Sequence, residues 1–151
     1  MGESSQGAGR GHQDAASPLE ASLALDGDGS PIARARHLAA AFLAKARDDH
    51  GIPVVTSTVE VVQLIVSELV TNARTYAPGP ARLHLRIIGA VVRVQLWDSS
   101  PVLPAVRAPD PERIGQHGLE IVTALAHRVT MEQTLVGKRV VVDVVLGTAA
   151  P

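Results

Sequence analysis

Apolar residues recur along the chain with two different periods, and each period predicts one kind of element. Between residues 55 and 73, Val, Leu and Ala return at steps of three or four, which is typical of the buried face of a helix. Between residues 82 and 97, apolar and polar residues alternate, which is typical of strands with one open face. The full predicted order is strand 21–25, helix 31–49, a helix from about 55 that Pro78 stops, strands 82–87 and 92–97, helix 118–126, and strands 128–133 and 138–146.

Capping and turn residues support these boundaries. Ser30 is a good N-cap with Pro31 at the first helical position, and Gly51 with Pro53 ends that helix. Gly89 marks the turn between the two alternating strands. Because strand pairs follow one another directly and the helices are grouped, the order predicts an α+β two-layer sandwich. We expect a mixed, mostly antiparallel β-sheet with the helices packed on one face.

The length of 151 residues fits one domain. Residues 1–20 are rich in Gly, Ser and Ala and predict a flexible N-terminal tail. The domain is expected at 21–147, with a short C-terminal tail at 148–151. The proline-rich stretch 99–117 is longer than most loops, and loops of this length are often lids or binding loops.

Composition narrows the class of protein. Hydrophobic residues make up 46% and charged residues 19%, as in a globular chain. The net charge of −1 argues against binding nucleic acid or an acidic membrane through bulk charge. No apolar run reaches a membrane span and the N-terminus is unlike a signal peptide, so we expect a cytoplasmic protein. The absence of cysteine excludes disulfides and thiolate chemistry, and aromatic residues are only 2%.

Three groups of residues carry candidate chemistry. Glu68 and Asn72 are four residues apart and share one face of the predicted helix. A carboxylate can act as a base and an amide oxygen can bind Mg²⁺, although the pair also fits the solvated edge of an amphipathic helix. Asp98 has the core-facing phase at the end of its strand. It could accept a hydrogen bond from a ligand amino group, or be satisfied within an Asp-Ser-Ser-Pro turn.

The third group is the segment 115–119, Gly-Gln-His-Gly-Leu, which leads from the long loop into a helix. Free N–H groups and the helix dipole at such a start suit phosphate, but glycine is also common at ordinary helix starts. The order of the three groups resembles the Bergerat-type ATP-binding fold of gyrase, the heat-shock chaperone ATPase, histidine kinases and anti-sigma-factor kinases. It is most similar to the small stand-alone anti-sigma-factor-like ATPases of actinobacteria.

The resemblance, which runs from about residue 21 to residue 146, implies a role for each matched position. Asn72 would coordinate Mg²⁺ bridging the ATP phosphates, Glu68 would be the general base, and Asp98 would accept the adenine amino group. The remaining expected nucleotide contacts are Gly115, His117, Gly118, Leu119 and Lys138. Lys138 stands where histidine kinases have the threonine that lines the adenine pocket.

The resemblance also implies a function. It indicates an ATP-dependent serine/threonine protein kinase that acts as an anti-sigma factor and phosphorylates an anti-anti-sigma partner, with a homodimer as one possible assembly. Two differences from the family favour an alternative, a nucleotide-gated protein-binding module without catalysis. Thr75 stands where many relatives carry Lys or Arg, and Ser100 and Pro101 replace the glycines after the aspartate.

Overall fold

The computed structural model describes residues 19–25, 30–76, 79–99, 116–135 and 137–147, without the side chains of 76 and 116–118. Within these residues the chain forms five strands and three helices. Their bounds are β1 Glu20–Ala24, α1 Pro31–His50, α2 Thr56–Tyr76, β2 Arg82–Ile88, β3 Val91–Asp98, α3 Gln116–Leu125, β4 Arg128–Gln133 and β5 Lys138–Val145. The predicted order of elements is confirmed, and the ends lie within two residues of the prediction.

Local signals in the sequence account for the ends of the first helix. The Ser30 side chain accepts a hydrogen bond from the backbone N–H of Ala33 at 3.2 Å, which caps the start of α1. Gly51 ends the helix in the left-handed conformation, with φ of 65°. Gly89 adopts φ of 57° in the tight turn between β2 and β3, where residues with side chains are strained.

The five strands form one sheet in the order β1-β2-β3-β5-β4. All four neighbouring pairs of described strands are antiparallel, so the expected mixed sheet is not found. The reason is the position of β5. Strands β3 and β4 run parallel, joined through α3, but β5 lies between them and pairs antiparallel with both.

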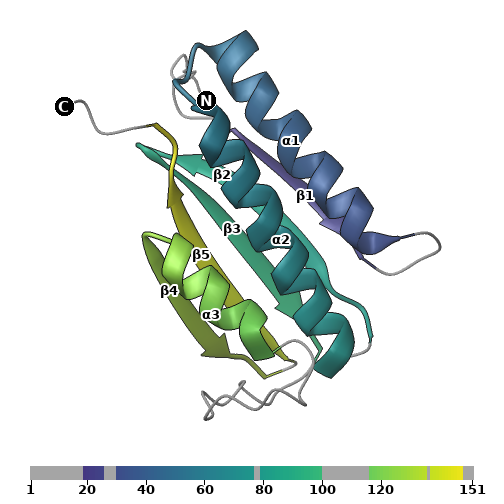
Figure 1. Ribbon diagram of the computed structural model, residues 1–151. Coiled ribbons are helices and arrows are strands. Elements are labelled where there is room, and N and C mark those ends of the chain that lie inside the picture. The colour runs from purple at the N-terminus through teal and green to yellow at the C-terminus, as the bar shows by residue number, and fades with distance from the viewer. Residues whose placement is uncertain (1–18, 26–29, 77–78, 100–115, 136, 148–151) are drawn as a thin grey trace, which may run out of the picture.

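The three helices cover one face of the sheet, and the two-layer α+β prediction is confirmed (Figure 1). The core lies between the layers and consists mainly of Val, Leu, Ile and Ala from both. From the sheet, β3 contributes Val92, Val94 and Leu96 to this core, as the alternation of apolar and polar residues predicts. Among the described residues, no helix combines the length and the apolar character needed to cross a membrane.

Candidate functional site

The predicted site residues come from elements whose ends meet at one end of the molecule. The last turns of α2, the end of β3, the start of β5 and the start of α3 lie at the lower end of Figure 1. Helix α2 packs against α3 and also contacts β3 and β5. Residues that are far apart in the sequence, such as Asn72 and Lys138, are therefore held on adjoining elements.

Asn72 is the clearest sign of a missing partner. Seven polar or charged residues are buried in the described part of the chain, and six of them have polar partners. The side chain of Asn72 is the exception: its residue is only 5% exposed, and no described group forms a hydrogen bond with its amide. An unsatisfied buried amide costs about 1–3 kcal/mol. Because the residue is buried, Asn72 does not lie on a solvated edge of the helix.

Glu68 lies one helical turn before Asn72 on the same face of α2. It is half-buried, and no ion pair or hydrogen bond to its carboxylate is found within the described residues. The hydroxyl of Thr75, one turn further on, donates to the carbonyl of Thr71 at 2.9 Å within the same helix. Within the described residues, the Glu68 carboxylate therefore has no polar partner.

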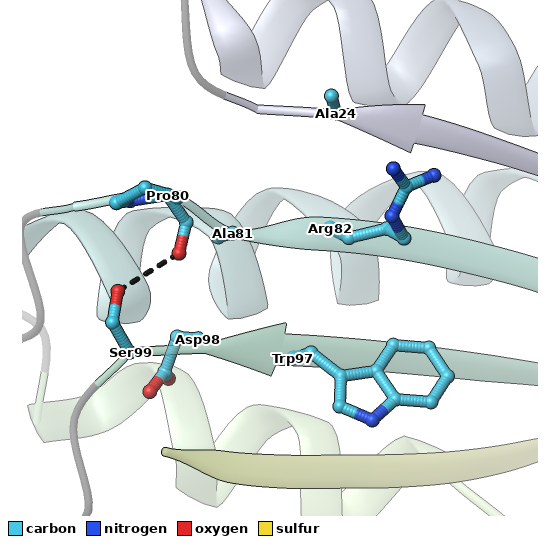
Figure 2. Close-up of a pocket in the computed structure, with 7 residues that line it drawn as sticks. All are labelled: Ala24, Pro80, Ala81, Arg82, Trp97, Asp98 and Ser99. Atoms are coloured by element: carbon cyan, nitrogen blue, oxygen red, sulfur yellow. Dashed lines mark hydrogen bonds between the residues drawn. The ribbon is translucent and has the colours of Figure 1, made fainter. Parts of the chain in front are cut away.

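Asp98 and Lys138 form a buried ion pair. The two residues are direct partners across β3 and β5, and Lys138 Nζ lies 2.6 Å from Asp98 Oδ2. Their side chains are only 1% and 2% exposed, so the carboxylate and the ammonium neutralise each other away from bulk water. The Ser99 hydroxyl does not donate to the Asp98 carboxylate, because it donates to the Pro80 carbonyl at 2.9 Å (Figure 2).

The sequence analysis named both residues and missed their pairing. The available signal was strand phase. Lys138 has the same inward phase on β5 as Val140 and Val142, and Asp98 has the inward phase on β3. Two inward-facing charges of opposite sign at strand ends are expected to meet if the strands are neighbours. That β5 rather than β4 adjoins β3 is a tertiary fact that the pattern did not reveal.

Gly137 allows the ends of these strands to approach. A Cβ atom added at Gly137 would lie 1.8 Å from the Asp98 carbonyl oxygen and 2.9 Å from its carbonyl carbon. Only a residue without a side chain fits against this backbone. The close approach places Lys138, the next residue, directly opposite Asp98.

The predicted phosphate-facing segment is described only in part. Gly115 lies outside the described residues, as do the stretch 100–115 and the two tails apart from residues 19 and 20. His117 and Gly118 belong to α3, which begins at Gln116 rather than at Gly118, and Leu119 is half-buried. The roles of these four residues stay predictions.

The described residues fit a nucleotide better at its phosphate end than at its base end. A buried amide and a half-buried carboxylate, both without a polar partner in the described part of the chain, suit a cation and a reacting hydroxyl, respectively. No group of three or more His, Cys, Asp or Glu that could hold a metal occurs among the described residues. A magnesium ion at Asn72 would therefore need most of its ligands from phosphate and water, as is usual for Mg²⁺.

Comparisons with known proteins find similarity among solved structures. No family model and no curated protein matches the chain. Among solved structures, it is similar to the histidine kinase domain of the blue-light-activated histidine kinase EL346 from Erythrobacter litoralis, with a TM-score of 0.46 and 21% identity. The match covers 72% of this chain and 61% of that chain. Likeness at this level does not assign an activity, because one fold can host many functions.

Proposed function

We propose that this protein is a Mg·ATP-binding regulator of the Bergerat type, and that it acts as a serine/threonine protein kinase. The observation that carries the proposal is the Asn72 amide, buried to 5% exposure and without a described partner, one turn from the available Glu68 carboxylate. A ligand contact at Asn72 would remove the energetic penalty of that amide. The order of motifs in the sequence supports ATP as the ligand.

Each residue of the site would have a distinct task. The Asn72 side-chain oxygen would be a ligand of Mg²⁺, and a Glu68 carboxylate oxygen would take the proton from the acceptor hydroxyl of the protein substrate. Bound ATP would supply the phosphoryl group, and Mg²⁺ would neutralise its charge. Phosphoryl transfer depends mainly on positioning and charge neutralisation, so this small set of protein groups is sufficient.

At the base end, the ion pair would position the predicted adenine acceptor. A carboxylate can accept several hydrogen bonds, so Asp98 would accept from the adenine amino group while it stays paired with Lys138. The pair also supports the second candidate, a nucleotide-gated protein-binding module. A carboxylate already neutralised by Lys138 contributes less to holding ATP for turnover.

The biological role follows from the resemblance and belongs to the proposal. The protein substrate would be an anti-anti-sigma partner, and the regulated partner a sigma factor, in the cytoplasm. Phosphorylation of one partner would release the other. A homodimer is compatible with this role, and direct contact with nucleic acid is not required.

The test compares two substitutions on the same face of α2. Asn72→Ala should weaken binding of Mg·ATP about 5- to 100-fold, the effect of about 1–3 kcal/mol. It should change the affinity for ATP without Mg²⁺ much less. Glu68→Gln should leave nucleotide binding nearly intact and lower phosphorylation of the cognate partner about 10²- to 10⁴-fold. Isothermal titration measures the first effect, and transfer of labelled phosphate measures the second.

Two other positions of α2 provide matched controls. Glu60→Gln makes the same chemical change at an exposed site two turns earlier, and Thr75→Ala truncates an exposed side chain near Asn72. Both controls should behave as the unmodified protein. Failure of the unmodified protein to bind Mg·ATP would overturn the proposal. Nucleotide-dependent binding of the cognate partner without its phosphorylation would select the binding module instead.

A further inference from the structure

The face of the sheet that the helices leave uncovered carries an ordered grid of side chains. Strand register places five residues, one from each strand, in each of three rows across this face. The first row is Ala24, Arg82, Trp97, Arg139 and Glu132, the second is Ser22, His84, Gln95, Val141 and Thr130, and the third is Glu20, Arg86, Arg93, Asp143 and Arg128. We call this surface the open face.

Positive charge is in excess on the open face. It holds five arginines and three carboxylates, whereas the chain as a whole has a net charge of −1. Arg86 and Arg93 even lie directly opposite each other on neighbouring strands. Like charges in this arrangement are unfavourable unless anions compensate them. The open face therefore differs in charge from the rest of the molecule.

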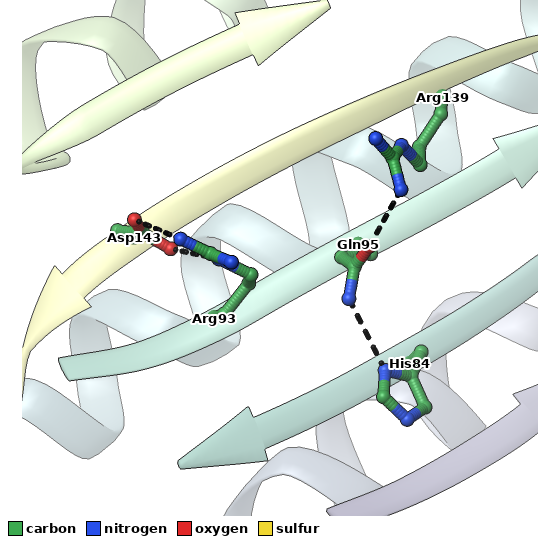
Figure 3. A network of polar contacts seen from close by, with 5 residues as sticks. All are labelled: His84, Arg93, Gln95, Arg139 and Asp143. Atoms are coloured by element: carbon green, nitrogen blue, oxygen red, sulfur yellow. Dashed lines mark hydrogen bonds and ion pairs between the residues drawn. The ribbon is translucent and has the colours of Figure 1, made fainter. Parts of the chain in front are cut away.

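Two of the arginines and all three carboxylates are used in a fixed network. Arg93 donates two hydrogen bonds to Asp143, at 2.8 and 3.1 Å, and these bonds raise the pKa of the guanidinium above its ordinary value (Figure 3). Arg139 is paired with Glu132 and donates to the amide oxygen of Gln95 at 3.5 Å. The network of polar contacts continues from the Gln95 amide nitrogen to His84 Nδ1 at 3.3 Å. It ends with the contact between His84 Nε2 and Glu20 at 2.6 Å.

The other three arginines remain available. Arg82, Arg86 and Arg128 are exposed, and none has an ion pair within the described part of the chain. By strand geometry, Arg82 and Arg86 are roughly 13 Å apart along β2, and Arg86 and Arg128 are roughly 14 Å apart across three strand gaps. An extended segment with several negative groups matches this spacing of backbone positions better than a single small anion does.

A hollow of about 320 Å³ lies beside Trp97 at the end of the open face (Figure 2). Most of the surface that lines the hollow is apolar, and Arg82 is the basic residue of the lining. The lining residues are Ala24, Pro80, Ala81, Arg82, Trp97, Asp98 and Ser99. Because Lys138 neutralises Asp98, the available charge at this hollow is positive. The hollow suits an apolar side chain that has a carboxylate close by in the same molecule.

From this arrangement we infer that the open face binds an acidic segment of a protein partner. Carboxylates of the segment pair with Arg82, Arg86 and Arg128, and one apolar side chain enters the hollow beside Trp97. The inference does not depend on the proposed kinase function, since Trp97 and the three available arginines are not among the residues that would hold ATP. The hollow shares only Asp98 with the proposed nucleotide site.

Two other occupants fit the observations less well. Single-stranded nucleic acid needs free aromatic faces for stacking. Trp97 is already flanked by His84 in a T-shaped contact and by the Arg139 guanidinium, 5.9 Å from its ring centre. A second copy of this chain would place one arginine-rich face against another, and the excess positive charges would repel.

Trp97 allows a direct test, because it is the only tryptophan in the chain. The probe is a synthetic peptide rich in Glu with a central Leu and no Trp, and its control has Gln in place of every Glu. The acidic peptide should shift the Trp97 emission to saturation, and added salt should weaken its binding. The Gln peptide should produce no saturable shift.

Variants locate the effect on the open face. The triple variant Arg82→Gln, Arg86→Gln and Arg128→Gln should bind the acidic peptide about tenfold more weakly or worse. The matched control, Lys45→Gln, Arg47→Gln and Arg74→Gln, removes the same charge from exposed helix positions and should bind as the unmodified protein does. Circular dichroism confirms that both variants are folded.

Three results would overturn the inference. The first is no emission change with the acidic peptide. The second is equal weakening in the two triple variants, which would show an effect of net charge alone. The third is another occupant: tighter binding of oligothymidylate than of the peptide, or a dimer in sedimentation that only the open-face variant loses.

Discussion

Asp98, Lys138 and Asp143 are the charged residues buried in the described part of the chain, and each is ion-paired. At the scale of single residues, each ion pair offsets the free-energy penalty of removing its two charges from water. The Asp98–Lys138 pair holds two strand ends together only as long as both charges are present. Losing one partner leaves the other desolvated without compensation, which costs far more than the pair contributes.

Lys138→Met should therefore lower the free energy of unfolding by about 3–5 kcal/mol, because the buried Asp98 carboxylate would lose the ammonium that lies 2.6 Å away. Adding Asp98→Leu to this variant should recover most of the loss. Urea unfolding measures both effects. The control is Arg47→Gln, which breaks an ion pair with Asp48 whose side chains are 46% and 63% exposed, and should cost less than about 1 kcal/mol. A loss that the second substitution does not recover would mean that the pair is not the cause.

At the scale of elements, the ends of β3 and β5 show how one glycine sets the position of a strand. The backbone at Asp98 and Ser99 occupies the space that a side chain at Gly137 would need. The turn between β4 and β5 can then bring Lys138 against Asp98. Helix α2 contacts β3 and β5 and carries Glu68 and Asn72 on one of its faces.

Gly137→Ala should destabilise the protein by about 1–3 kcal/mol, because its Cβ atom would meet the Asp98 carbonyl oxygen at 1.8 Å and the strands would have to separate. Gly147→Ala is the control, since its Cβ atom would lie 3.6 Å from the Pro53 carbonyl oxygen, which is ordinary van der Waals contact. Thermal unfolding of the two variants makes the comparison. Similar melting temperatures would contradict the close approach.

At the scale of the whole molecule, the small residues of α1 allow the helix layer to lie close to its neighbours. Ala35, Ala39 and Ala46 are fully buried, and α1 packs against α2 and contacts β1 and β2. A chain with 2% aromatic residues has few large side chains to fill a wider gap. The small residues instead let the layers pack closely, so that no wide gap has to be filled.

Ala39→Leu should cost about 1–3 kcal/mol, because the added atoms have no space between the layers. Ala41→Leu makes the same change at an exposed position of α1 and should be close to neutral. Guanidinium unfolding with both variants tests the packing. Equal midpoints for the two would show that the layers can separate without cost.

The sequence by itself determined the elements and their faces. The periods of two and near 3.6, the Ser30 cap and the Gly89 turn are local signals, and each acts through the backbone of its own segment. The same periods placed Asp98 on the inward side of its strand and put Glu68 and Asn72 on one helix face. The role of the last two in binding stays a prediction, because no described contact tests it.

Only the tertiary structure decided which strands are neighbours, because strand order depends on the packing of the whole sheet and leaves no local mark. The insertion of β5 between β3 and β4 made the sheet antiparallel and joined Lys138 to Asp98. The same order placed Trp97 beside Arg139 and Arg93 beside Asp143, and so created the open face. The burial of Asn72 is likewise a property of the assembled layers, because a helix period gives the face of a residue but not what lies opposite it.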